Sequence, residues 1–537
     1  MSQISRRERS EVVKTTHGPV QGFESSGMKS FLGIPYAAPP VGDLRWRPPI
    51  SPSRWTETLE AVDFGSICAQ DTSCFPGFGA KSTTEDCLYL NVYVPKSRQE
   101  EGNEAPHPVM VLFPGGGLFC GGSNDYDPRN LVEQGDIIFV SLNYRLGIFG
   151  FFSHPAINAE DHPVGNYGIM DQQFALNWVQ HNIEAFGGDP RNVTIMGESA
   201  GGISVMVHLA APQSRGLFHR AIVQSGGSPP SVVYPSLPSL ETKGVALALA
   251  AGCKEPTAIS LRMMSTEAIL AANAVPPGSF GVGEYTVGLM EDGVIVPQGL
   301  RERFNHGQFS RVPLLIGVNR DEFSWFQGMM ELATNNPVSA DMYPHALAMT
   351  LSAAAQLRIS SAKISPEKMR SILQRYPLKI DSNPAKVLSA AVGDASIIST
   401  CGRRTTRIIR QFVSHVYAYE FDVPDSPVSW PEPSFPYDSG HAQDLQFLFP
   451  GFCGGSGIPR TLNGAQQQLA KRMVEYWTTF ARNGRPTITE GSTSTNLVWK
   501  AYDTEKDNIM LLCTPVPRMV DGWGQRHNSD FWDSMYI

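Results

Sequence analysis

The sequence predicts an α/β fold. Along its 537 residues, short apolar runs alternate with segments of helical periodicity, which is typical of α/β proteins. Apolar residues make up 42% of the chain and charged residues 18%, a composition that excludes a disordered protein. Less regular, helix-rich segments occur near residues 230–300 and 325–410. We expect these two insertions to form the walls or the lid of a site.

The apolar runs predict buried strands, at Val109–Phe113, Ile137–Leu142, Val193–Met196, Val312–Val318 and Val413–Phe421. Two segments with apolar residues at helical spacing predict amphipathic helices. The first helix spans Gln172–Phe186 and ends at the Gly-Gly-Asp-Pro sequence that follows. The second carries an apolar stripe that stops at Gly484 and comprises Leu469, Met473, Trp477, Phe480 and Ala481.

Charge and cysteine usage exclude several classes of protein. Lys and Arg total 43 against 51 Asp and Glu, so the net charge of −8 argues against a nucleic-acid-binding surface. The eight cysteines lack metal-ligand spacing, and we expect neither a metal nor a cofactor. No apolar run approaches the ~18 residues of a membrane span. The N-terminus lacks the apolar core of a secretory signal, which predicts a cytoplasmic protein, or a secreted one if the chain was trimmed.

The sharpest local signal is the sequence Gly197-Glu198-Ser199-Ala200-Gly201. It follows a predicted strand and precedes a segment that can form a helix, which is the context of a nucleophile elbow. In such a turn the small residues let the backbones approach closely, and the strained serine exposes its hydroxyl. A chance match to the motif can occur in a glycine-rich chain, so the motif alone is weak evidence for a nucleophile. The predicted strand before it strengthens that interpretation.

A second signal is the run Gly115-Gly116-Gly117 directly after the strand at Val109–Phe113. Glycines leave backbone N–H groups unobstructed, as an oxyanion hole requires. A flexible loop would have the same composition. The run precedes the elbow by about 80 residues, the order expected of a donor loop on an earlier strand.

An esterase also needs an acid and then a histidine after the serine. The candidate histidines are His306, His345, His415, His441 and His527. His415 falls in a predicted strand and His527 in a polar stretch near the chain end, where we expect a solvated residue. His441 occupies a polar loop, a good place for a partly exposed base. Asp321 and Glu322 both follow the strand at Val312–Val318, and this pattern does not separate the two acids.

The chain resembles the type-B carboxylesterase/lipase family, which includes the cholinesterases. The most specific matching stretches are Glu85-Asp86-Cys87-Leu88-Tyr89-Leu90-Asn91 and Phe186–Gly201, and others extend from Phe31 to Gly484. The resemblance therefore covers nearly the whole chain. It implies that residues 1–537 form a single domain with an α/β-hydrolase fold, in which helices flank a central, mostly parallel sheet. The helical insertions near residues 230–300 and 325–410 then form the substrate gorge.

The resemblance also implies roles for individual residues. Ser199 corresponds to the nucleophile, Glu322 to the acid and His441 to the base. Gly116, Gly117 and Ala200 correspond to the oxyanion donors, and Glu198 and Ser225 to groups that surround the histidine without reacting. The family's disulfide loop is matched at both ends, by Cys68 and Cys87. The loop has no Trp, which argues against a choline ester specialist.

Three departures from the family pattern surround these residues: Pro114 precedes the glycines where His or Tyr is common, and Phe323 and Ala442 stand where Gly is usual. None of them removes a reacting group. Six side chains are candidates either for the gorge wall or for the core, namely Leu118, Phe119, Met290, Phe323, Trp325 and Phe326.

These observations predict a serine carboxylic ester hydrolase that acts on a small-molecule ester through an acyl-enzyme. Acyl transfer to an alcohol or amine would use the same triad. A non-catalytic binding module of cholinesterase-like proteins is the other alternative, although such members usually lose a triad residue. The sequence does not specify the ester or the oligomeric state.

Overall fold

The computed structural model describes residues 8–25, 27–96, 105–227, 234–274, 288–356, 364–488 and 498–535. Residues 228–233, 275–287 and 357–363, which belong to or flank the two predicted insertions, lie outside the described residues.

The described part of the chain forms one 13-stranded sheet. Its order is β1-β2-β3-β5-β7-β6-β8-β9-β10-β11-β12-β13, and β4 pairs with β2. Pairing is parallel from β7 through β12 and antiparallel along both flanks, except that the short β4 pairs parallel with β2. The predicted α/β architecture is thus confirmed. The strands are β1 (Glu8–Lys14), β2 (Pro19–Glu24), β3 (Met28–Pro35), β4 (Leu59–Glu60), β5 (Tyr89–Pro95), β6 (His107–Phe113), β7 (Ile138–Leu142), β8 (Gly188–Glu198), β9 (Arg220–Gln224), β10 (Leu314–Asn319), β11 (Val416–Phe421), β12 (Ile509–Leu512) and β13 (Arg518–Val520).

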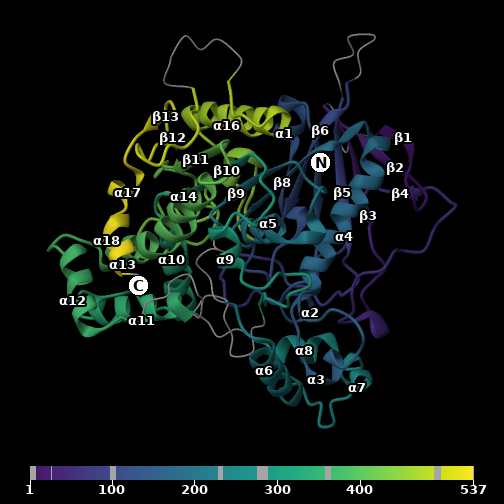
Figure 1. Cartoon of the computed structure of the whole chain (residues 1–537), viewed down its shortest axis with the longest axis horizontal. Helices are drawn as coiled ribbons and strands as arrows, with labels where there is room; N and C mark the ends of the chain where they lie inside the picture. Colours follow the sequence, from purple (N-terminus) through teal and green to yellow (C-terminus); the bar gives the residue numbers. More distant parts are fainter. Residues whose placement is uncertain are drawn as a thin grey trace, which may run out of the picture.

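Helices connect the strands and cover both faces of the sheet (Figure 1). The α-helices are α1 (Arg129–Gly135), α2 (Gly147–Gly150), α3 (Pro155–Asn158), α4 (Tyr167–Asn182), α5 (Ala200–Ala210), α6 (Leu237–Ala250), α7 (Ala258–Arg262), α8 (Thr266–Ala272), α9 (Leu300–Asn305), α10 (Glu322–Thr334), α11 (Tyr343–Gln356), α12 (Pro366–Arg375), α13 (Pro384–Gly393), α14 (Thr405–Arg410), α15 (Leu445–Leu448), α16 (Gly464–Asn483), α17 (Trp523–Arg526) and α18 (Ser529–Met535). Short 3-10 helices are η1 (Gly42–Leu44), η2 (Ser123–Asp125), η3 (Ile183–Phe186) and η4 (Pro212–Ser214), and η6 (Asp394–Arg404) is a π-helix.

Strand β6 shows why the central strands are apolar throughout. Successive side chains of a strand point to opposite faces. Val109 and Val111 belong to the buried cluster that contains the apolar sides of α4 and α5. Met110 and Leu112 belong to a second cluster, which contains those of α1 and α16. Both faces of the strand are therefore covered, as is typical of parallel sheets.

The predicted helices are present with shifted bounds. The first begins five residues earlier than predicted, as α4, and its last turn tightens into η3. The glycine at 187 ends η3 in a left-handed conformation (φ 84°). The predicted stripe of α16 is buried, and Gly484 ends that helix with φ 78°.

Two groups of helices lie beyond the sheet. Figure 1 shows α6, α7 and α8 gathered at one end of the molecule and α11, α12 and α13 at another. The second group has its own buried cluster, to which Leu347 of α11, Ile372 of α12 and Leu388 of α13 contribute. This cluster also includes Phe323 of α10, the helix that begins at Glu322, so it supports the helix that carries the candidate acid. None of the helices in the described ranges is long and apolar enough to cross a membrane.

His527 corrects one expectation. We expect a solvated residue from its polar surroundings in sequence, but the side chain is buried. Its Nδ1 atom lies 2.7 Å from a carboxylate oxygen of Asp394, and its Nε2 atom lies 2.7 Å from one of Glu420. Burial alone would lower the pKa of His527, but the carboxylates of Glu420 and Asp394 together outweigh burial and raise this pKa to about 10. The C-terminal segment is therefore held to η6 and β11 by a buried ionic cluster.

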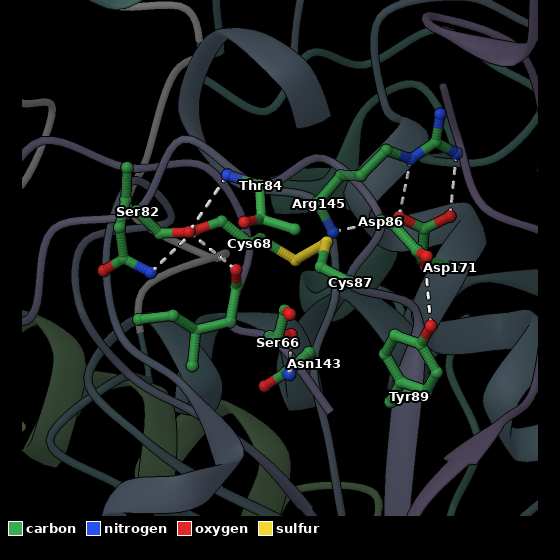
Figure 2. Close-up of a disulfide and its surroundings, with 12 residues drawn as sticks. Ser66, Cys68, Ser82, Thr84, Asp86, Cys87, Tyr89, Asn143, Arg145 and Asp171 are labelled. Carbon is green, nitrogen blue, oxygen red and sulfur yellow. Dashed lines mark hydrogen bonds and ion pairs between the residues drawn. A yellow bond between two sulfur atoms is a disulfide. The ribbon is translucent and has the colours of Figure 1, made fainter. Parts of the chain in front are cut away.

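Cys68 and Cys87 form a disulfide, 19 residues apart, as the family resemblance implies (Figure 2). The loop that they close is also held by backbone hydrogen bonds between Gln70 and Ser82. Phe75 of this loop packs against Trp325 in α10, with 5.3 Å between the centroids of the two rings. The disulfide loop therefore contributes to the environment of the candidate site.

Removal of this disulfide is expected to destabilise the protein. A loop of this length contributes about 3 kcal/mol to the free energy of unfolding by restricting the unfolded chain. The double variant Cys68→Ser/Cys87→Ser should therefore unfold at a lower urea concentration than the wild type. Dithiothreitol should lower the wild-type midpoint to that of the variant and leave the variant unchanged. Equal midpoints without reductant would contradict this expectation.

Candidate active site

The predicted site residues meet at the carboxyl ends of neighbouring strands. Gly116 and Gly117 follow β6, Ser199 follows β8, and Glu322 begins α10 shortly after β10. Strands β6, β8, β9 and β10 are adjacent and parallel. Their carboxyl ends therefore open at one edge of the sheet, where α/β proteins place their sites.

Ser199 occupies a strained turn between β8 and α5. Its backbone angles are φ 55° and ψ −122°, outside the regions that residues other than glycine normally adopt. The turn is held by a 2.8 Å hydrogen bond from the Ser199 N–H to the carbonyl of Gln224. A Cβ atom at Gly201 would lie 2.0 Å from the carbonyl oxygen of Phe113, so this position requires glycine. The geometry is that of a nucleophile elbow.

Three backbone N–H groups are available beside this serine. Gly116 and Gly117 adopt positive φ values of 109° and 63°, which favour glycine. Within the described part of the chain, the N–H groups of Gly116, Gly117 and Ala200 donate no hydrogen bond. The neighbouring Gly115 N–H, by contrast, donates to the hydroxyl of Tyr126 at 3.2 Å. The three unpaired donors can bind an oxyanion.

Glu322, not Asp321, contacts the histidine. The His441 Nδ1 atom lies 2.6 Å from Glu322 Oε2, and the other carboxylate oxygen accepts a 2.7 Å bond from the N–H of Asn319. Asp321 instead pairs with Arg320 and accepts from the N–H of Ser439. Glu322 is fully buried. Of the two acids between which the sequence pattern does not choose, Glu322 is therefore the one that contacts His441.

The other nitrogen of His441 faces Glu198. The Nε2 atom lies 3.1 Å from Glu198 Oε1 but makes no hydrogen bond in the described part of the chain, so no bond to Ser199 is present. Burial raises the pKa of Glu198. Burial would lower the pKa of His441, but the carboxylates of Glu198 and Glu322 outweigh it and raise this pKa. A serine–histidine bond often tightens only when substrate binds.

A further buried acid, Asp444, interacts electrostatically with His441 and is absent from the predicted set. It is fully buried and accepts from Gln224 Nε2 at 2.8 Å and from Asn319 Nδ2 at 3.4 Å. Burial raises its pKa. The only signal in the sequence is its position three residues after His441, since its amide partners come from distant segments.

Ser225 directly follows β9, and its N–H donates to the carbonyl of Gly317 at 2.8 Å. Its buried hydroxyl makes no hydrogen bond in the described part of the chain, and no bond joins it to His441. Ala442, which replaces a usual glycine, keeps a left-handed conformation with φ 64°. The carbonyl of Pro114 accepts from the Tyr144 hydroxyl at 2.8 Å, which fixes the start of the glycine loop.

Ser199, Glu198 and His441 line one cavity of about 70 Å³, together with Gly116 and Gly117. Of the six candidate gorge residues, Phe119, Trp325 and Phe326 line this cavity, whereas Leu118, Met290 and Phe323 are buried without lining it. The cavity is therefore largely aromatic, with further rings contributed by Phe75, Phe78, Tyr126 and Phe452. Such a lining suits an apolar organic substrate.

Comparison with known proteins identifies the family. A model of the carboxylesterase family matches residues 9–532. The chain belongs to the carboxylesterase family. The predicted resemblance, the α/β-hydrolase fold and an ester-hydrolase activity are thereby confirmed.

Carboxylesterase relatives match the chain along most of its length. It is 31% identical over 544 residues to cocaine esterase from Homo sapiens, covering 97% of this chain and 90% of that protein. It is 32% identical over 544 residues to acylcarnitine hydrolase from Mus musculus, with 94% and 88% covered. Carboxylesterase 1F from Mus musculus is 32% identical over 519 residues, with 88% and 86% covered. Two of these names, cocaine esterase and acylcarnitine hydrolase, refer to different esters, so the family alone does not specify a substrate.

Proposed function

We propose that this carboxylesterase hydrolyses its ester through an acyl-enzyme on Ser199, with His441 as the base and Glu322 as the acid. The observation that carries the proposal is the 2.6 Å contact between His441 and Glu322 beside the cavity that the strained Ser199 lines. A buried carboxylate at Nδ1 keeps the proton on that nitrogen, so Nε2 presents a lone pair to the serine.

In the first half-reaction, the Ser199 oxygen attacks the ester carbonyl while His441 Nε2 takes the hydroxyl proton. The resulting oxyanion receives hydrogen bonds from the N–H groups of Gly116, Gly117 and Ala200. Such donors typically contribute about 3–4 kcal/mol each to the transition state. His441 then gives its proton to the leaving alcohol, and Glu322 stabilises the imidazolium meanwhile.

In the second half-reaction, water attacks the acyl-enzyme by the same route and the acid is released. An alcohol or amine in place of water would give acyl transfer. The test is to supply an ester panel of varied acyl and alcohol size, with and without an added alcohol, and to quantify the products. We expect free acid as the main product in both cases. Predominant transfer, or no turnover of any ester by folded protein, would contradict hydrolysis as the function.

Glu198 is expected to set the pH range of this reaction. The base must be neutral, so kcat/KM falls as the pH drops through the pKa of His441. The negative charge of Glu198 raises that pKa. Glu198→Gln removes the charge, so the acidic limb of the profile should move to lower pH by about 1 unit.

The exposed Glu184 offers a matched control, since Glu184→Gln removes the same charge away from the site. Its profile should coincide with that of the wild type. An acidic limb that Glu198→Gln leaves in place, or moves to higher pH, would show that Glu198 does not act on the base as proposed.

A further inference from the structure

Gln70 is a buried amide that joins the disulfide loop to the glycine loop, residues 115–121, which carries two of the proposed oxyanion donors. It lies two residues after Cys68 and is 2% exposed. Its Oε1 atom accepts a 2.8 Å hydrogen bond from the N–H of Gly121, and its Nε2 atom donates to the carbonyl of Gly121 at 3.0 Å. One side chain therefore binds both backbone groups of the residue at which the glycine loop ends.

The partners of this amide determine its orientation. Nε2 also donates to the carbonyl of Cys68 at 3.0 Å, so the NH₂ group faces two carbonyl oxygens. The opposite orientation would place the amide oxygen against these two acceptors. The backbone of Gln70 is held as well, because its N–H donates to the carbonyl of Ser82 at 2.8 Å and its carbonyl accepts from the Ser82 N–H at 3.1 Å. The side chain therefore extends from a well-held position in the disulfide loop.

Gly121 packs against the start of the glycine loop. A Cβ atom at Gly121 would lie 2.4 Å from the carbonyl oxygen of Gly115, and the φ of 104° at Gly121 favours glycine. Between these two residues, the N–H groups of Phe119 and Cys120 donate to the carbonyl of Gly116 at 3.1 Å and 2.9 Å. The loop is therefore a closed turn whose two ends touch, so a displacement of Gly121 moves the peptide groups of the turn.

Groups outside the turn hold it at three points. The Tyr126 hydroxyl accepts from the N–H of Gly115 at the first end, and the N–H of Gly147 donates to a carbonyl in the middle. Gln70 holds the second end. In the described part of the chain, the backbone groups of Gly121 make no other hydrogen bond than those to Gln70. Without this amide, the second end of the turn would lose its only hydrogen-bonded support within the described ranges.

We propose that Gln70 is a positioning residue for ester hydrolysis: it holds the glycine loop against the disulfide loop and so keeps the N–H groups of Gly116 and Gly117 aligned with the oxyanion. The inference rests on the proposed function, in which these N–H groups bind the oxyanion. Gln70 does not line the cavity that contains Ser199, so it acts through the loop. Donors displaced from their positions stabilise the transition state less, because hydrogen bonds weaken steeply with distance and angle.

The test compares phenyl acetate with phenyl thionoacetate, in which sulfur replaces the carbonyl oxygen. Sulfur accepts hydrogen bonds weakly, so the thionoester gains less from the oxyanion donors. The measured quantity is the ratio of kcat/KM for the oxygen ester to kcat/KM for the thionoester, which does not depend on the fraction of active enzyme. We expect Gln70→Ala to lower kcat for phenyl acetate by about 10- to 100-fold with little change in KM, and to lower the ratio by about tenfold.

Two further variants complete the test. Gln70→Glu keeps the shape of the side chain but places a carboxylate oxygen against the carbonyls of Cys68 and Gly121, so it should also lower the ratio, and it serves if the alanine variant fails to fold. Gln466 is the matched control: this buried amide donates to the carbonyl of Asp425 at 2.9 Å and accepts from the N–H of Asn463 at 3.0 Å, away from the cavity. Gln466→Ala should keep the wild-type ratio.

Three results would overturn the inference. The ratio could change less than about twofold in folded Gln70→Ala or Gln70→Glu, or change equally in Gln466→Ala. The two esters could also lose rate in equal proportion, which would show that Gln70 supports the fold without aligning the donors. A folded wild-type enzyme that cleaves neither ester would instead refute the proposed function, so the two failures are distinguishable.

Discussion

Ser199→Ala and His441→Ala should each lower kcat for ester hydrolysis by about 10⁴-fold or more, because each removes a group that takes part in bond formation. The double variant should be no slower than the single variants, since the two residues act as one unit. Initial rates on a chromogenic ester, corrected for the uncatalysed reaction, measure both expectations.

Two exposed residues supply controls for these substitutions. Ser352→Ala removes a hydroxyl from the surface of α11, and His306→Ala removes an exposed imidazole just after α9, so their rates should match that of the wild type. Thermal unfolding of every variant would verify the fold. Rates near the wild-type value in Ser199→Ala or His441→Ala would exclude the assigned nucleophile or base.

Glu322→Gln should lower kcat by about 10⁴-fold although it preserves the shape of the side chain. The N–H of Asn319 donates to one Glu322 oxygen, so the amide oxygen of glutamine must take that position. The amide NH₂ then faces His441 Nδ1, which must accept rather than donate. The proton moves to Nε2, and this tautomer cannot take a proton from Ser199.

Asp321→Asn is the matched control for Glu322→Gln, because Asp321 is adjacent to Glu322 in the chain but pairs with Arg320. It should retain a kcat within about threefold of the wild type, consistent with a group that touches neither His441 nor the cavity. A larger loss in Asp321→Asn than in Glu322→Gln would contradict the position assigned to the acid.

The sequence predicts the parts of the site that depend on local backbone geometry. The elbow at Ser199 needs glycine at a position where a Cβ atom would collide with β6, and the oxyanion loop needs positive φ at Gly116. Such requirements restrict these positions to glycine, so they can be recognised in the sequence. The same holds for the continuous apolar character of β6, which follows from helices on both faces.

The parts that depend on long-range contacts are not predictable in this way. His527 stands in a polar stretch, yet its partners Asp394 and Glu420 lie more than a hundred residues earlier in the chain. The choice between Asp321 and Glu322 also depends on where His441 lies in space. Residue type and spacing do not record which of two adjacent acids faces inward.

The most direct test of the account is to incubate the protein with a fluorophosphonate and to locate the adduct by peptide mass mapping. The reagent reacts with a serine only where a base and an oxyanion hole activate it. We predict one adduct per chain, on Ser199, and its loss in Ser199→Ala. Folded protein that forms no adduct, or forms it on another serine, would contradict the proposed mechanism and favour the binding-module alternative or a different nucleophile.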